Sequence, residues 1–411
     1  MAAKRIVAER LPNAADLFKQ LHEHEIISFD MLPEKIQYNI KTKELAVYIA
    51  SEIDTYMDKA MNASSIEEME DIVKIFHRVI SALIRLREWP VINKMVQAVS
   101  DFSSRMDVSS DASELLVNLP DSIFDGSDEI FAEEYIQAEK DMRNQMDEIL
   151  MKMTSTCIKV LGSVFAKGKD PSILKNAIDI MSKKGDLARQ WAIKALDDRS
   201  QSLPMLNIAL LMIINVGHDN DIDVIKKYAQ HSNSNIRTRA LDATVKLNKK
   251  ESEILIIEAL NDEDEKVRDR AATLIERESS LSEESVNKLL LYIKTKLLQK
   301  KDITIHEAKR LAGLLRAMGK LTDYINKNLL EDEILEIVSD LLKGKTGLLK
   351  FIKADLTEEQ LEIIYAGLST LGKIGGSKSR TFLNTISRGN TTLSKSAHEA
   401  MEELDKKLSK R

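Results

Sequence analysis

Residues 236–240 read Ile-Arg-Thr-Arg-Ala, and residues 267–271 read Val-Arg-Asp-Arg-Ala. The two stretches lie about 31 residues apart, and each sits in a segment whose apolar residues recur at helical spacing. The same offset aligns further apolar positions across Ile222–Glu278, such as Ile225 with Ile256. A period of this length, with helical units, predicts stacked helix pairs that bury their apolar faces against one another.

The helical rhythm extends from Pro171 to the end of the sequence. A weaker copy of the unit precedes the two clear ones, because the same offset places Ala209 in register with Ala240 and Ala271. Small residues at this position allow neighbouring helices to approach closely. We therefore predict a repeat array over residues 171–411.

The residues before the array follow other patterns. Residues 1–106 contain long helical stripes without the 31-residue echo, which predicts an atypical helical N-terminal cap. Turn-forming residues dominate 107–126, so this segment is expected to be an acidic loop. Residues 127–170 are expected to form a long helical connection, broken near Met153.

The composition supports helices throughout. Among 411 residues, 43% are apolar, which is enough for a substantial core, while only 5% are aromatic. Six prolines and fourteen glycines provide too few turns for an all-β protein. The expected fold class is therefore all-α, an α-solenoid of antiparallel helix pairs.

Charge and cysteine content restrict the function and the compartment. A net charge of −6 disfavours a dedicated nucleic-acid binder, which neutralises phosphates with clustered cations. Cys157 is the only cysteine, so no internal disulfide forms, as is usual in a reducing compartment. Residues 1–10 lack the apolar core of a signal peptide, and the apolar run 208–216 is too short to cross a bilayer. We expect a cytoplasmic protein without membrane segments.

Residues 107–150 hold thirteen acidic residues and only two basic ones, for a net charge near −11. Such a segment is usually a solvated loop and helix face. The alternative is an acidic docking surface for a basic partner.

Three segments carry a family resemblance. Residues 260–271 and 233–240 share the turn and the start of the following helix, and residues 368–376 read Leu-Ser-Thr-Leu-Gly-Lys-Ile-Gly-Gly. These segments resemble HEAT repeats, in particular the short bacterial HEAT-like kind related to the bilin-lyase repeats. The resemblance implies a scaffold whose second helices line a concave face. It also implies that Asp264 and Arg268 form a structural ladder between repeats, with Arg237 in the same role beside Asn233 or Asn235.

Motifs for catalysis are incomplete. Gly344-Lys345-Thr346 lacks the earlier glycine of a phosphate loop. Cys157 lies on an apolar stretch and is expected to be a buried, inert thiol. We expect no catalytic residue, no metal and no cofactor, and hence no enzyme.

Two histidine–glutamate pairs raise an alternative. His306-Glu307 and His398-Glu399 align with the start of a second helix in the repeat. Deoxyhypusine hydroxylase, an enzyme built on HEAT-like repeats, holds two irons with such pairs, but it needs four converging pairs. A metal-dependent hydroxylase, or a lyase acting on a prosthetic group, is therefore a minor alternative to a scaffold.

A nucleic-acid-binding HEAT-like protein is a further alternative. The cations at 294, 296, 300 and 301 form a basic run, which is more typical of a solvated face than of a phosphate track. The leading prediction is a noncatalytic scaffold or adaptor for a protein partner. The residues expected to contact the partner lie on second helices: Thr238, Asp242, Lys246, Asp269, Thr273 and Arg277.

Overall fold

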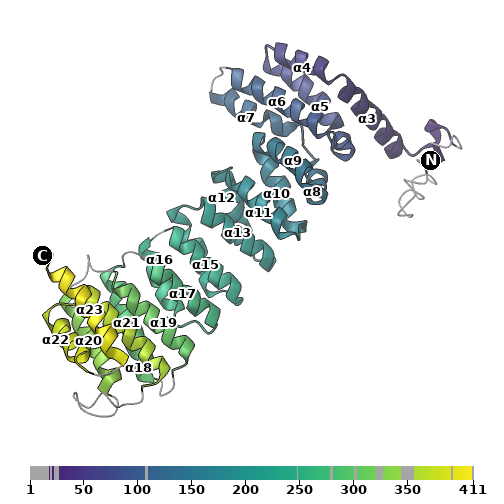
Figure 1. Cartoon of the computed structure of the whole chain (residues 1–411). Helices are drawn as coiled ribbons and strands as arrows, with labels where there is room; N and C mark the ends of the chain where they lie inside the picture. The colour runs from purple at the N-terminus through teal and green to yellow at the C-terminus, as the bar shows by residue number, and fades with distance from the viewer. Residues whose placement is uncertain are drawn as a thin grey trace. The chain divides into compact units, whose positions relative to one another are not determined.

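The computed structural model describes residues 18, 21–22, 27–106, 110–247, 249–277, 281–299, 303–320, 327–343, 356–389 and 392–409. Within these residues every regular element is a helix and no β-strand occurs (Figure 1). The predicted all-α, helical-repeat fold is therefore confirmed. The chain divides into two compact units, residues 1–195 and residues 196–411, so the predicted start of the array at residue 171 lies inside the first unit.

The first unit consists of helices that pack on their neighbours in the chain. Helix α5 is central and contacts α3, α6, α7 and α8. The helices are α3 (Glu34–Ser51), α4 (Ile53–Asn62), α5 (Ile66–Leu86), α6 (Trp89–Arg105), α7 (Ser110–Ser122), α8 (Asp128–Gln137), α9 (Lys140–Lys152), α10 (Ser155–Lys167), α11 (Pro171–Ser182) and α12 (Asp186–Asp197), the last of which crosses into the second unit. A short 3₁₀ turn, η1 (Phe29–Met31), precedes α3.

The residues at the two ends of helix α5 explain where the helix begins and ends. The Ser65 hydroxyl accepts the backbone N–H of Glu68 at 3.2 Å, which satisfies one of the free donors of the first turn. Its buried face follows the predicted stripe from Met69 to Ile84. The helix ends at Arg87, whose left-handed φ of 61° lets the chain turn directly into α6.

The predicted acidic loop is wrong over residues 110–122, because these residues form helix α7. Pro120 is one of the turn-forming residues of this segment, but here it lies inside the helix. Proline has no N–H, so the carbonyl of Leu116 loses its helical partner. The Ser103 hydroxyl on α6 donates to that carbonyl at 2.8 Å, and this tertiary contact lets the helix continue through its proline.

The acid at the end of α7 has a structural role. Asp121 is buried, and its carboxylate accepts the backbone N–H of Thr156 at 2.7 Å and that of Thr154 at 3.1 Å. These donors belong to the first turn of α10. Asp121 therefore caps a helix that begins more than thirty residues later.

The long helical connection predicted over 127–170 consists of three helices. The break predicted near Met153 is present between α9 and α10, but a second break at Ala138–Glu139 was missed. Arg143 stabilises this break, since its guanidinium donates to the carbonyls of Tyr135 and Ala138. A side chain that follows the break therefore satisfies the carbonyls that α8 leaves open.

The second unit is a stack of helix pairs in two layers (Figure 1). One layer contains the second helix of each pair: α13 (Leu203–Val216), α15 (Ser234–Lys246), α17 (Glu265–Arg277), α19 (Ile305–Met318), α21 (Glu358–Ile374) and α23 (Thr392–Leu408). The other contains α14 (Ile222–Lys226), flanked by the 3₁₀ turns η2 (Asp219–Asp221) and η3 (Lys227–Gln230), then α16 (Lys249–Ala259), α18 (Glu283–Gln299), α20 (Lys327–Lys343) and α22 (Ser377–Ser387).

A continuous cluster of buried apolar side chains runs through this stack from Leu241 to Leu404. Ala209, Ala240 and Ala271 are fully buried where the second helices pack, as their small size predicted. Each pair therefore completes its core only with its neighbours, which is the stabilising principle of helical repeats.

Replacement of Asp121 by alanine tests the cap on α10. We expect the free energy of unfolding of the first unit to fall by about 2–3 kcal/mol, because buried N–H donors lose their acceptor. Both tryptophans, Trp89 and Trp191, lie in this unit, so their fluorescence during denaturant unfolding reports on it. The exposed Asp125→Ala variant is the control, and an equal loss in both variants would refute the capping role.

Candidate functional site: the polar surface between repeats of the second unit

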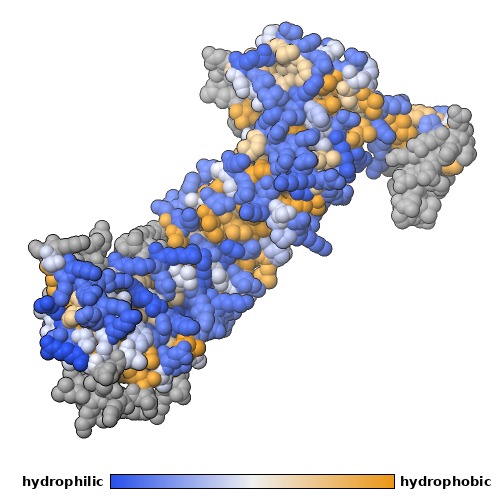
Figure 2. Space-filling view, in the orientation of Figure 1, coloured by the Kyte–Doolittle hydropathy of each residue, from blue (hydrophilic) through white to orange (hydrophobic). Residues whose placement is uncertain are grey.

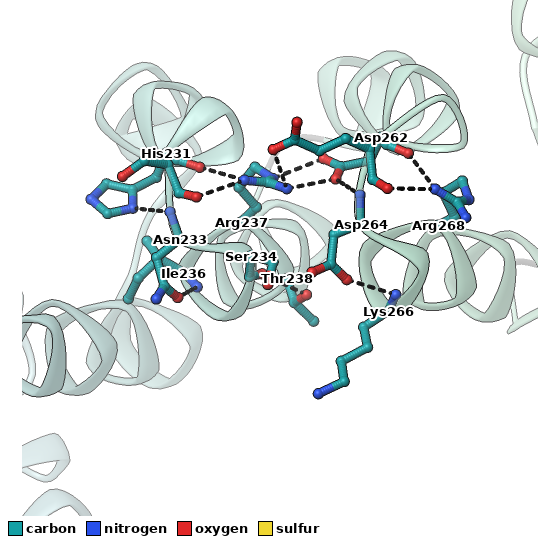
Figure 3. Close-up of polar contacts among 12 residues, drawn as sticks. His231, Asn233, Ser234, Ile236, Arg237, Thr238, Asp262, Asp264, Lys266 and Arg268 are labelled. Atoms are coloured by element: carbon teal, nitrogen blue, oxygen red, sulfur yellow. Dashed lines mark hydrogen bonds and ion pairs between the residues drawn. The ribbon is translucent and has the colours of Figure 1, made fainter.

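Arg237 connects two neighbouring repeats (Figure 3). Its side chain is 7% exposed, and its Nε and Nη2 atoms donate to the two carboxylate oxygens of Asp262 at 2.8 and 2.7 Å. Its Nη1 atom donates to the carbonyls of His231 and Ser232, in the turn before its own helix. The hydrogen bond with Asp262 raises the pKa of the guanidinium, which stays charged at all relevant pH.

In the next repeat, Arg268 makes the same contacts with the carbonyls of the preceding turn. Its Nη1 atom donates to the carbonyls of Asp262 and Glu263, which lie six and five residues before it. Arg237 bonds to the carbonyls six and five residues before it in the same way. The arginine at this register thus holds its own turn in both repeats.

Asp264 caps its own helix and also contacts the preceding repeat, where a side-chain hydrogen bond with Ser234 at the start of α15 lowers its pKa. Its carboxylate accepts the backbone N–H of Lys266 at 2.9 Å, which caps α17 as Asn233 caps α15 (Figure 3). A second acid, Asp262, also reaches the neighbouring repeat and pairs with Arg237. The sequence interpretation overlooked it, because it sought partners for Arg237 only in the turn before that arginine.

A second set of polar contacts joins the second helices to one another. The Arg239 Nε atom on α15 donates to the Asn207 side-chain oxygen on α13 at 3.1 Å. The Arg270 Nε atom on α17 donates to the Asp242 carboxylate on α15 at 2.5 Å. Each second helix here is therefore cross-linked to the one before it by an arginine.

The series continues at α19. Arg310, only 4% exposed, places Nε at 2.9 Å and Nη2 at 2.7 Å from the same oxygen of Asp269 on α17, and His306 Nε2 lies 2.7 Å from the other oxygen. Burial would raise the pKa of Asp269, but hydrogen bonds with His306 and Arg310 outweigh it and hold the pKa below its ordinary value. Asp269 thus remains ionised at neutral pH.

The structure separates the six predicted partner-contacting residues into three groups. Asp242 and Asp269 are engaged by arginines of the following helix. Thr238 and Thr273 donate their hydroxyls to the carbonyls four residues earlier on their own helices. Lys246 and Arg277 are exposed last residues of α15 and α17, and neither forms an ion pair with a described residue.

A groove of about 450 Å³ lies between α13 and α15. Its polar lining includes the predicted Thr238 and Asp242, together with Arg239 and three asparagines, of which the sequence analysis named Asn233 and Asn235 only as neighbours of Arg237 and did not name Asn207. Asn207, Asn233 and Asn235 carry both donors and acceptors on one side chain. The lining residues are Leu203, Pro204, Asn207, Asn233, Asn235, Ile236, Thr238, Arg239 and Asp242.

Two tyrosines also connect repeats and were not singled out from the sequence. The hydroxyl of Tyr228 donates to the carbonyl of Leu196, and that of Tyr292 donates to the carbonyl of Leu260 at 3.1 Å. Both reach back by the same number of residues, about one period. The two tyrosines lie 64 residues apart, which is two more than twice the 31-residue offset, so the repeat alignment does not place them in register.

The histidine–glutamate pairs do not converge. His306 on α19 contacts Asp269, whereas His398 on α23 contacts Glu402 on its own helix at 3.2 Å. Among the described residues, no group of three or more His, Cys, Asp or Glu side chains is arranged to hold a metal ion.

The predicted basic run is partly neutralised, because Lys294 on α18 pairs with Glu333 and Glu336 on α20. Lys300 and Lys301 lie outside the described residues. Over the part of the chain that the structure covers, no helix has the length and apolar character needed to cross a membrane.

Comparison with known proteins gives the following likenesses. No family model matches the sequence, and no curated protein matches it. Among solved structures, the chain is similar to an engineered protein from the Northeast Structural Genomics Consortium, at 15% identity over 96% of this chain and 99% of that one, with a TM-score of 0.33. It is also similar to a Kap121p mutant at 12% identity, with a TM-score of 0.43, and it spans 50% of that protein's length while 99% of this chain is covered.

Substitution of Arg237 tests the contact between repeats. We expect Arg237→Ala to lower the free energy of unfolding of the second unit by about 3–5 kcal/mol, because Asp262 is left buried without its partner. Arg237→Lys should also destabilise, since an ammonium group lacks the planar fork that fits a carboxylate. Far-UV circular dichroism during denaturant unfolding measures the change, and the exposed Arg388→Ala is the control. A midpoint for Arg237→Ala equal to that of the control would contradict the role.

The labelling rate of Cys157 tests whether its thiol is inert in the folded protein. The side chain is fully buried on α10, and burial raises its pKa to about 12. Because the thiolate is the reactive form, we expect a disulfide reagent at pH 8 to label the folded protein at least about a hundredfold more slowly than the unfolded protein. Equal labelling rates with and without denaturant would show that the thiol is accessible.

Proposed function

We propose that this protein is a noncatalytic scaffold of HEAT-like helix pairs, which binds an extended segment of a partner protein in the groove between α13 and α15. The groove itself is the observation that carries the proposal. Its volume of about 450 Å³ falls within the range of binding pockets. In keeping with its lone, buried cysteine, we place the protein in the cytoplasm.

The lining suits a peptide backbone. An extended peptide presents alternating N–H and C=O groups, and each must find a partner when water is displaced. The side-chain NH₂ groups of Asn207, Asn233 and Asn235 can donate to carbonyls of the peptide, and the Asn235 oxygen can accept from its N–H groups, whereas the other two oxygens already accept from Arg239 and from the first turn of α15. Leu203, at 45% exposure, and Pro204 add an apolar wall for a side chain.

The polar floor of the groove is held in place before any partner binds. Arg239 is bonded to Asn207 and lies 3.6 Å from Asp242, and Asp242 is bonded to Arg270. Side chains fixed in this way lose little conformational entropy on binding, so more of the interaction energy contributes to affinity. Support for a binding surface therefore comes from the same arginines that cross-link the helices.

The partner should carry acidic residues beside the segment that enters the groove. Lys246 and Arg277, at the ends of α15 and α17, form no ion pair with any residue that the structure describes, whereas Asp242 and Asp269 are already paired. Charges at the edge of an interface act mainly on association rate and specificity.

Photo-crosslinking tests this function. A photoreactive amino acid at the exposed position Asn235 should capture one predominant protein from a cell extract, and the same group at the exposed position Glu258 on α16 should not. With that protein purified, Asn207→Ala should weaken its binding at least about tenfold, because an amide that bonds the backbone is lost. Glu258→Ala is the matched control for the affinity measurement. Equal capture at both positions, or unchanged affinity for Asn207→Ala, would overturn the proposal.

A further inference from the structure

A second groove, of about 1140 Å³, lies within the first unit between α3, α5 and the start of α8. Figure 2 shows hydrophobic residues gathered over α3, and Tyr38 and Val47 on this helix are 58% and 55% exposed. The residues that matter for its chemistry are Tyr38, Lys43, Val47, Arg78, Arg85 and Ile130. From this groove we infer a binding site for an acidic peptide segment of a partner protein, separate from the site on the second unit.

Three cations in the groove have no internal use. Lys43 on α3 and Arg78 and Arg85 on α5 are all exposed, and none forms an ion pair with a described residue. Some other cations of the same unit are paired, such as Arg87 with Glu134 and Lys94 with Asp54. A charged side chain without an internal partner is free to bind an external one.

The two arginines are placed to act together. They lie seven residues apart on α5, so two helical turns bring them to the same face, about 10 Å apart. This spacing corresponds to about three residues of an extended chain. A peptide with acids at matching positions could pair with both guanidinium groups, which favour carboxylates through their planar fork.

The net charge of the groove opposes that of the chain. Glu44 and Asp125 also line it, but the three cations leave an excess of positive charge. The whole chain carries −6. Electrostatic complementarity therefore selects a negatively charged ligand at this place.

The apolar part of the lining favours a peptide over a nucleic acid. Tyr38, Val47 and Ile130 offer contacts for aliphatic or aromatic side chains, and Ser81 and Ala82 add small side chains between the two arginines on α5. A nucleic acid carries a charge at every nucleotide and would meet Glu44 and Asp125, whereas a peptide can place acids only where cations lie. From Tyr38 to Val47 the groove follows about 14 Å of helix, which matches about four extended residues.

Peptide selection on the full chain tests this inference. Random peptides displayed on phage are selected on the wild-type protein, and an enriched peptide is synthesised with a fluorescent label for anisotropy titration. We expect enriched sequences that combine Asp or Glu with Leu, Ile or Phe. Arg78→Glu/Arg85→Glu should weaken binding of the labelled peptide at least about tenfold, and added salt should weaken it in the wild type.

The control is Lys140→Glu/Lys175→Glu, which makes the same change in net charge at two exposed positions of the first unit outside the groove. It should bind the peptide as the wild type does, and circular dichroism verifies the fold of both variants. Selection without acidic enrichment, or equal loss in both double variants, would overturn the inference. So would a wild-type dimer that only Arg78→Glu/Arg85→Glu dissociates, which would make a second copy the occupant, or tighter binding of labelled oligouridine RNA than of the peptide.

Discussion

The stack of the second unit depends on a buried guanidinium. Each repeat contains a turn between its two helices, and this turn leaves carbonyl groups without helical partners. Arg237 donates to two of these carbonyls and, with its other two nitrogens, to the carboxylate of Asp262 in the next repeat. Removing an arginine and a carboxylate from water is costly unless nearly every donor is used, as it is here. The turn of one repeat is thereby fixed to that of the next.

Buried side chains satisfy backbone groups of distant residues at other places in the second unit as well. Buried acids complete helices that begin far away in sequence, since Glu331 accepts the N–H groups of Gly376 and Ser379 at the start of α22. Glu253 accepts the N–H of Ser282 just before α18. Apolar burial supplies most of the stabilisation, but it is not directional. These polar contacts fix how each helix pair is rotated and shifted against its neighbour.

The sequence predicted what depends on local pattern and missed what depends on contacts between distant residues. Helical spacing and small residues such as Ala240 and Ala271 correctly indicated stacked helices. The loop expected over 107–126 failed because Ser103 satisfies the carbonyl that Pro120 leaves open, which no local rule reveals. Asp262 was missed for the same reason, since its partner lies 25 residues earlier. Of the surface residues, the pattern could place Asp242 on a second helix but could not show that Arg270 already binds it.

The distribution of unpaired charge distinguishes structural residues from residues available for binding. In the second unit Asp242 and Asp269 are paired with arginines of the next helix. The groups left for a partner in the groove between α13 and α15 are therefore mainly amides, such as those of Asn207 and Asn235. In the first unit Arg78 and Arg85 have no ion-pair partner among the described residues and lie beside exposed apolar side chains. Unpaired cations beside apolar surface contribute little to a fold, because water solvates the charge equally well in the unfolded chain. Their position together in one groove is the basis on which we propose a ligand there, and the two proposed sites differ in the chemistry of the ligand that they would bind.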